Sequence, residues 1–184
     1  MTPLEVAKAR IRAIIAGSSV PEDPSHAEDT LAWLLRLKPD ADEALQIAAL
    51  GHDIDRATPD RVRRADFADY DAFKAAHARR SARLLREILG QALVDGHVTE
   101  RVCHLVELHE SGGTPDSDLL READSLSFFT NNLADYLARE GEAEALRRSR
   151  WGVTRLSDAG RKLLASFHFE DARIARIVRQ ALEG

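Results

Sequence analysis

Four histidines and two aspartates in the first two thirds of the chain are the residues best suited to chemistry. His52 and Asp53 are adjacent in the run AALGHDIDRA, and the other members lie around this pair at helix-scale separations: His26, His77, His109 and Asp124. Each outlying member falls on the apolar stripe of its own predicted helix, where an unpaired ionisable group would be costly to bury. A shared cation offsets that cost, so the set predicts a metal site.

Helical spacing decides which histidines belong to this set. His26 shares a predicted helix face with Trp33 and Leu37, and it is therefore expected to point inward. His104 precedes His109 by five residues, about half a turn around the helix axis, so the two are not expected to bind the same ion. We therefore predict His109 as the ligand and His104 as a residue of another face.

The ligand types narrow the choice of metal. Imidazole and carboxylate together suit Fe, Mn, Co, Ni or Zn better than Ca, and no cysteine lies nearby to form a thiolate zinc site. We expect one or two divalent transition-metal ions. The alternative interpretation is a buried polar network of the same side chains without an ion.

Basic residues close to the His-Asp pair predict a site for an anion. Arg56 follows Asp53 at a spacing of three, and the next loop carries three more arginines: Arg61, Arg63 and Arg64. Guanidinium groups can bind a phosphate through two parallel hydrogen bonds. We predict Asp53 and Arg56 as catalytic residues, and Arg56 and Arg80 as substrate-binding residues. The alternative for the loop arginines is that they are solvated charges, neutralised by Asp60, Asp66 and Asp69.

Helices are the elements that must position these residues, because almost every periodic segment has helical spacing and none alternates with period two. The fold class expected is all-α, a single domain over residues 1–184 with about seven to nine helices. The predicted helices run from Pro3, capped by Thr2, to Gly17, from Ser25 to Leu37, from Asp40 or Asp42 to Arg56, from Tyr70 to Leu89, from Thr99 to Glu110, and from Ser117 to Arg139, with two or three shorter ones within 142–182.

Composition excludes several other classes of protein. Hydrophobic residues make up 44% of the 184 residues and charged residues 31%, which is typical of a globular protein. The net charge of -5 argues against binding of a nucleic-acid duplex through a basic surface. Cys103 is the only cysteine, which excludes an internal disulfide and favours a cytoplasmic location. No run approaches the ~20 apolar residues of a membrane span, so no membrane partner is expected. The sequence leaves the oligomeric state open.

The order of the candidate ligands resembles the HD superfamily of metal-dependent phosphohydrolases. The matching pieces are SHAEDTLAWLL, AALGHDIDR, HARRSARLL, LVELHESGG and LLREADSLSFF, which together cover residues 25–135. This resemblance implies an HD-type helical bundle with its core motifs in 25–135 and a C-terminal helical extension in 142–184. The run PDADEALQIAALGHDIDR also resembles an uncharacterised family known only as a domain of unknown function.

The resemblance also implies roles for individual residues. His77 and His109 look like the subset of the superfamily that holds two metals. In that subset His26, His52, Asp53 and Asp124 would hold one ion, and Asp53, His77 and His109 the other, with Asp53 bridging. A carboxylate can link two ions roughly 3.5–4 Å apart, and a water between them loses its proton near neutral pH. The short interval from His109 to Asp124 is similar to HD-class hydrolases that split dinucleoside polyphosphates symmetrically. Many relatives carry Gly-Lys where this chain has Asp55-Arg56.

The function expected from these features is hydrolysis of a phosphoester or phosphoanhydride in a small phosphorylated substrate, such as a nucleotide or a dinucleoside polyphosphate. Two alternatives stay open at this point. The same six ligands resemble those of mixed-valent di-iron oxygenases of the superfamily, and a non-catalytic metal- or nucleotide-binding module would need them as well. Spacing alone does not separate the three.

Overall fold

Capping residues set the starts of the first and third helices where the sequence predicts them. The computed structural model describes residues 1–184 and contains helices only, as predicted. The first helix begins at Pro3, after Thr2, whose hydroxyl accepts a hydrogen bond from the Glu5 amide while the Glu5 carboxylate accepts one from the Thr2 amide. These bonds satisfy amide groups that have no partner within the helix. Asp42 caps the third helix in a similar way, through the amide of Leu45.

The chain forms ten α-helices, or nine if α6 and α7, which a π-helical turn joins, are counted as one. They are α1 (Pro3–Ile15), α2 (Asp23–Leu37), α3 (Glu43–Gly51), α4 (Tyr70–Gln91), α5 (Gly96–Leu108), α6 (Pro115–Ser127), α7 (Leu133–Glu140), α8 (Glu142–Thr154), α9 (Asp158–Ser166) and α10 (Ala172–Glu183). Two 3-10 turns, Ile54–Ala57 and Arg64–Asp66, lie between α3 and α4. The three helices after residue 142 match the prediction of two or three.

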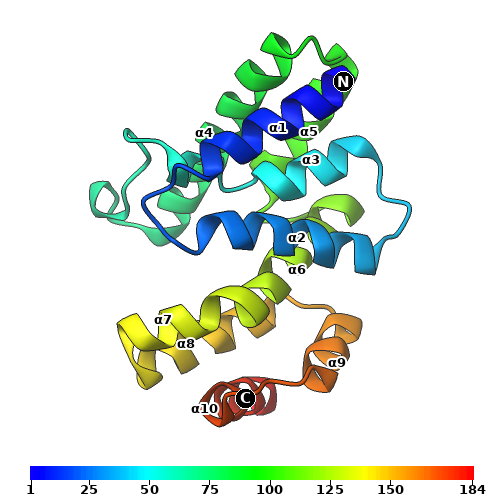
Figure 1. The fold of residues 1–184 in the computed structure, drawn as a ribbon. Coiled ribbons are helices and arrows are strands. Elements are labelled where there is room, and N and C mark those ends of the chain that lie inside the picture. Colours follow the sequence, from blue (N-terminus) through cyan, green and yellow to red (C-terminus); the bar gives the residue numbers. More distant parts are fainter.

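The helices form an upper group and a lower group that meet at α2 and α6 (Figure 1). Helices α1, α3, α4 and α5 pack together in the upper part, and α2 packs against both α3 and α6. Helices α7 to α10 make the lower part, where α8 packs against α10. Buried apolar residues from α1 to α10 nevertheless form one continuous core.

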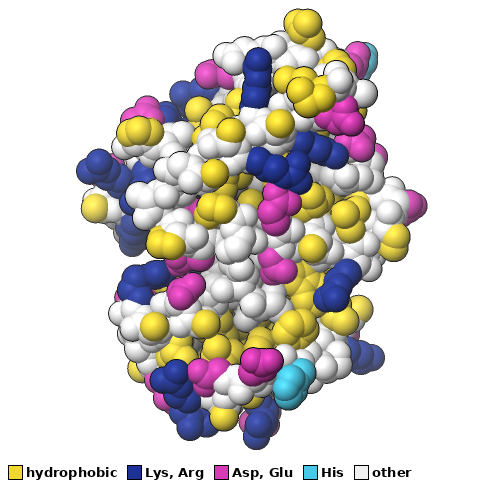
Figure 2. Space-filling model, in the orientation of Figure 1, with side chains coloured by type: hydrophobic (Ala, Val, Ile, Leu, Met, Phe, Trp, Pro, Cys, Tyr) yellow, Lys and Arg dark blue, Asp and Glu magenta, His cyan; other side chains and the backbone are white.

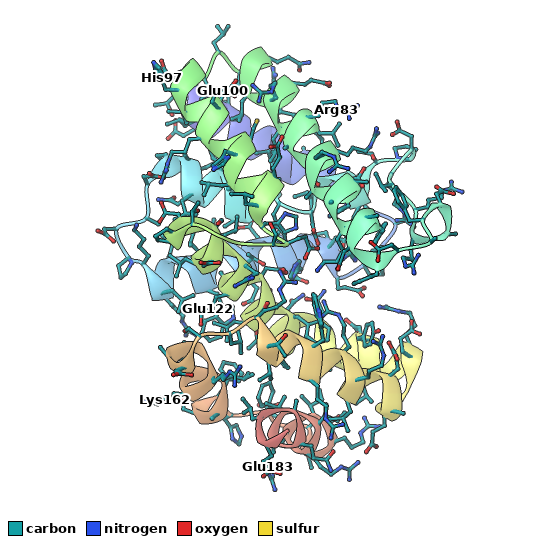
Figure 3. All side chains as sticks on the ribbon, turned by 180° about the vertical axis from the view of Figure 1, so that it is seen from behind. Arg83, His97, Glu100, Glu122, Lys162 and Glu183 are labelled. Carbon is teal, nitrogen blue, oxygen red and sulfur yellow. The ribbon has the colours of Figure 1, made fainter.

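Hydrogen bonds from Ser157 to the buried side chain of Glu122 connect α9 to α6. Glu122 of α6 accepts hydrogen bonds from the amide of Ser157 at 3.0 Å and from its hydroxyl at 2.6 Å. Ser157 in turn caps α9 through the amide of Gly160. Figure 3 shows Glu122 at this junction, just above α9. None of the helices is both long enough and apolar enough to cross a membrane.

The third helix is shorter than predicted. The sequence predicts it to continue to Arg56, but it ends at Gly51, and a 3-10 turn over Ile54–Ala57 follows. One reason for the early end is a tertiary contact, because the amide of Asp55 donates a hydrogen bond to the hydroxyl of Ser81 on α4. His52 and Asp53 therefore lie at the helix terminus, where side chains can converge with those of other helices.

The segment predicted as one helix from Ser117 to Arg139 is interrupted. It begins earlier, at Pro115, and a π-helical turn, Phe128–Asn132, separates α6 from α7. Thr130 in this turn accepts a hydrogen bond from the indole of Trp33 and donates one to Asp29, both on α2. Such turns carry one extra residue and often lie at functional sites.

Candidate metal centre and its cleft

The structure brings all six predicted ligands together, from five different elements. His26 lies on α2, His77 on α4 and Asp124 on α6, whereas the other three follow helix ends: His52 and Asp53 after α3, and His109 after α5. Their nitrogen and oxygen atoms form two groups that could each hold a metal ion. One comprises His26, His52 and Asp53, and the other Asp53, His77 and His109. Asp53 belongs to both groups, as a bridging ligand would.

Asp53 and Asp124 are the two carboxylates toward which the imidazoles point. The Nε2 atoms of His77 and His109 lie 2.8 and 3.7 Å from Asp53 Oδ1. The Nε2 atoms of His26 and His52 lie 3.2 and 3.5 Å from Asp124 Oδ1. Asp124 therefore faces the same centre as the first group.

Each imidazole is held through its other nitrogen. The Nδ1 atoms of His52 and His109 lie 2.9 and 2.7 Å from the carbonyl oxygens of Ala49 and Val106, one turn earlier in the chain. A carbonyl can only accept, so in the neutral imidazole these Nδ1 atoms carry the proton and Nε2 keeps the lone pair. This arrangement of the outer nitrogen is typical of histidine metal ligands.

One further observation supports the fit of these donor atoms to a metal ion. The Nε2 atoms of His52 and His109 are buried and have no hydrogen-bond partner in the protein. A buried polar atom without a partner is costly. A divalent cation between these nitrogen lone pairs and the carboxylate oxygens would offset that cost, because both are donors to a metal. The residues present therefore fit one or two transition-metal ions, with four imidazoles and two carboxylates as donors.

The electrostatics of this cluster show strong coupling between imidazole and carboxylate. Burial lowers the pKa of His52, but the charges of Asp53 and Asp124 outweigh burial and raise this pKa to about 9. Burial opposes protonation of His77 as well, and hydrogen bonds to Asp53 and Asp55 raise its pKa to about 10. For Asp53, burial favours the neutral form, yet the histidines hold its pKa well below the usual range. The carboxylates are thus ionised and ready to bind a cation.

A fully buried carboxylate that the sequence analysis did not select, Asp55, supports His77 from behind. Its Oδ2 lies 3.0 Å from His77 Nδ1 and accepts the amide of Val62 at 3.1 Å, while its Oδ1 lies 2.7 Å from Arg80 Nε. Arg80 also binds Asp60 and does not line the cleft, so this geometry favours a supporting role over the predicted contact with substrate. In the sequence, Asp55 could have been selected from its position two residues after Asp53.

A cleft of about 500 Å³ opens beside Asp53 and Asp124. Its walls carry four of the six predicted ligands, two aromatic rings from α4 and many cations. The four ligands are His26, Asp53, His77 and Asp124. The cations are Arg56, Arg61, Arg63, Arg64, Lys74, Arg148 and Arg155. Only three carboxylates line it, namely Asp53, Glu110 and Asp124. Figure 2 shows basic side chains gathered at the left edge of the molecule, where Figure 1 places the loop between α3 and α4.

Arg56 faces the centre, as predicted. Its Nη1 lies 3.4 Å from Asp53 Oδ2, and its Nη2 lies 2.8 Å from Asp23 Oδ1. The predicted reason, a continuous helix from Asp53, is wrong, because the 3-10 turn brings Arg56 to this place. Arg61, Arg63 and Arg64 also line the cleft, and Arg63 and Arg64 are exposed. None of the three pairs with Asp60, Asp66 or Asp69, and Asp60 binds Arg80 instead.

Further cleft residues come from positions that the sequence analysis did not select. Lys74 and Arg155 both bind Glu110, with distances of 2.9 and 3.2 Å to its Oε2. Arg155 also binds Asp124 Oδ2 at 2.9 Å and so holds this ligand from the side of α8. Lys74 could have been selected from the sequence, because it lies one turn before His77 on α4. Arg155 follows α8, and its approach to Asp124 depends on tertiary packing alone.

The other three histidines lie elsewhere. His104 is exposed on another face of α5, as predicted, and His97 and His168 are exposed too. Figure 3 shows His97 at the far upper end of the molecule. Trp33 is a core residue, as expected.

Comparison with known proteins yields one relationship. Neither the curated proteins nor the solved structures gave a significant match. A family model described as "Domain of unknown function (DUF4202)" matches residues 9–178, which include all six candidate ligands and most of the helical fold. The predicted resemblance to an uncharacterised family, known only as a domain of unknown function, is consistent with this match. The chain belongs to the DUF4202 family.

Proposed function

We propose that the protein is a metal-dependent phosphohydrolase of the HD type that acts on a small phosphorylated molecule. The observation that carries the proposal is the position of Asp53, which is shared by two possible metal-binding groups and faces a cleft rich in arginine. Divalent ions bound there would supply a Lewis acid and lower the pKa of a water toward neutrality. The resemblance of the ligand order to the HD superfamily supports the same reaction class.

The protein's own residues would bind and orient the phosphate. Arg56 uses two of its five N–H donors on Asp23 and Asp53, so others are left for a ligand, and a guanidinium pairs well with phosphate oxygens. Arg155 and Lys74 are fixed by Glu110 and add positive charge to the wall of the cleft. Fixed cations of this kind stabilise negative charge as it develops on the transferred phosphoryl group.

The experiment is a screen for hydrolysis without oxygen. Nucleoside mono-, di- and triphosphates, dinucleoside polyphosphates and an aryl phosphate are incubated anaerobically with Mn²⁺, Co²⁺ or Ni²⁺, and released phosphate and nucleotide are measured. We expect activity in the wild type and its loss in His52→Ala and Asp53→Ala, with His104→Ala as the matched control. Arg56→Ala should lower kcat/KM by at least about tenfold, which corresponds to one charge-assisted hydrogen bond.

Two outcomes would contradict the proposal. Consumption of oxygen that requires ferrous iron, with no anaerobic hydrolysis, would assign the same ligands to an oxygenase. Absence of both activities, with metal bound, would support a binding module.

A further inference from the structure

The cations of the cleft differ in whether a carboxylate neutralises them. Arg56 is bound to Asp23 and Asp53, and Lys74 and Arg155 are bound to Glu110. Arg148, on α8, makes no ion pair and no hydrogen bond within the protein, although it is half-buried and lines the same cleft. A guanidinium with five donors and no acceptor is an uncommon group to leave without a partner.

Aromatic rings hold Arg148 in place. Its guanidinium carbon lies 4.1 Å from the ring centre of Trp151 and 4.6 Å from that of Phe128. The same indole contacts Lys74 at 4.3 Å and Arg155 at 4.7 Å. Three cations thus share one tryptophan, and only two of them have a carboxylate partner. Stacking fixes the position of Arg148 but leaves its hydrogen-bond donors free for an external acceptor.

Arg148 is connected to the candidate metal centre through Trp151 and Arg155. Arg155, its neighbour over Trp151, binds Asp124, which is one of the six candidate ligands. Burial lowers the pKa of Arg148 and the charge of Arg155 lowers it further, whereas Asp124 and Glu110 act in the opposite direction. Arginines of the loop before α4, including Arg63, also line the cleft. An anion at Arg148 would therefore lie next to a phosphate bound at Asp53, inside a strongly cationic cavity.

We propose that Arg148 binds a second phosphate of the substrate, adjacent to the one that reacts at the Asp53 centre. This inference rests on the proposed function and makes it more specific. It predicts a preference for molecules with consecutive phosphate groups over esters of a single phosphate. A single phosphate needs only the centre, whereas a polyphosphate chain also gains the donors of Arg148.

The test compares the binding of two inorganic probes, orthophosphate and tripolyphosphate. Affinities are measured by calorimetry on the metal-loaded protein, with Mg²⁺ in excess of the polyphosphate in every experiment. Arg148→Gln should weaken tripolyphosphate binding about tenfold or more, as expected for the loss of a charge-assisted hydrogen bond, and change orthophosphate binding less than twofold. Arg148→Lys, which restores the charge, should recover part of the loss.

Arg147 provides the matched control, because it is the preceding residue on α8 but is exposed, does not line the cleft and binds Glu144. Arg147→Gln should leave both affinities unchanged. If Arg148→Gln does not fold, Arg148→Met keeps the stem that packs on Trp151 and serves in its place. The proposal is overturned if Arg148→Gln or Arg148→Met binds tripolyphosphate as tightly as the wild type does, or if the binding of both probes is weakened equally.

These outcomes are separate from those of the hydrolysis screen. Tripolyphosphate binding that depends on Arg148 in a protein without hydrolytic activity would support the subsite and refute the reaction. Hydrolysis in the wild type with tripolyphosphate binding unchanged in Arg148→Gln would support the reaction and refute the subsite.

Discussion

At the level of single residues, the site depends on side chains that hold other side chains in place. Each histidine of the cluster has one nitrogen directed to a carboxylate and the other fixed by a hydrogen-bonding partner: Ser127 for His26, Ala49 for His52, Asp55 for His77 and Val106 for His109. Among these partners Asp55 is the only carboxylate, and it is completely buried. Partners of this kind orient metal ligands and raise their basicity.

Asp55→Asn should therefore weaken metal binding without abolishing it. The amide keeps the size of the side chain but loses the charge that Arg80 and His77 share, so the orientation of His77 becomes less fixed. We expect a loss of about 10–100-fold in the affinity of the weaker-bound ion, measured by competition with a chromophoric chelator. Asp60→Asn, which alters the exposed partner of Arg80, is the control. Equal effects of the two variants would show that the carboxylate of Asp55 has no special role.

The pKa values of the histidines predict that metal binding depends on pH. In the metal-free protein the pKa values of His52 and His77 are raised to about 9 and about 10, so both imidazoles carry an extra proton at pH 7. A metal ion binds the neutral form and must displace that proton. Affinity should thus rise about tenfold or more per pH unit between pH 7 and 9, with protons released on binding. Calorimetry in buffers of different ionisation enthalpy measures this release, and pH-independent affinity would rule it out.

At the level of helices, the ends of the elements matter more than their lengths. Three of the six ligands follow a helix end, and the turn after α5 sets the direction in which α6 continues toward Asp124. Gly112 in that turn has φ +70°, and a Cβ there would lie 2.1 Å from Asp118 Oδ1. The Asp118 carboxylate also accepts the amide of Gly113, so it is not free to move away.

Gly112→Ala should consequently lower the free energy of unfolding by about 1–3 kcal/mol, through the strained backbone and the close contact. The matched substitution is Gly90→Ala in α4, where a Cβ would meet nothing within 4 Å. That variant should be neutral or more stable by about 0.5–1 kcal/mol, because alanine is the better helix former. Urea denaturation measures both. A Gly112→Ala protein as stable as the Gly90→Ala protein would contradict the account of this turn.

The sequence predicted most of the helices and the convergence of the candidate ligands, because both follow from local periodicity and residue type. It placed a helix start after Thr2 and another at Asp40 or Asp42, of which Asp42 is the cap, and it selected six residues that the structure brings together. It was wrong about the end of α3, where the bond from Asp55 to Ser81 competes with the helical pattern. It did not find Arg148 or Arg155, whose approach to the cleft depends on how the C-terminal helices pack.

For the whole molecule, the centre connects parts of the chain that are distant in sequence. His26 and Asp124 lie on the helices where the upper and lower groups meet, and His77 belongs to the upper group. An ion bound by such residues stabilises the folded state alone, because the unfolded chain does not bring the ligands together. Stability should therefore depend on metal.

Removal of metal with a chelator should lower the Tm. A single ion at a free concentration of 100 times its Kd contributes about 2.7 kcal/mol, which for a chain of this size corresponds to roughly 5–10 °C. Differential scanning calorimetry before and after addition of Mn²⁺ measures the change. His104→Ala should show the same response as the wild type, and Asp53→Ala should show almost none. A Tm that chelation leaves unchanged would indicate a polar network that is stable without an ion.

The central claim, that Asp53 is the shared ligand of a two-ion centre, is tested most directly by metal content per chain. Protein purified without chelator is analysed by mass spectrometry of its metals, for the wild type and for Asp53→Ala, His77→Ala and His104→Ala. We predict up to two transition-metal ions in the wild type and in His104→Ala, a partial loss in His77→Ala and loss of both in Asp53→Ala. Full metal content in Asp53→Ala would contradict the claim.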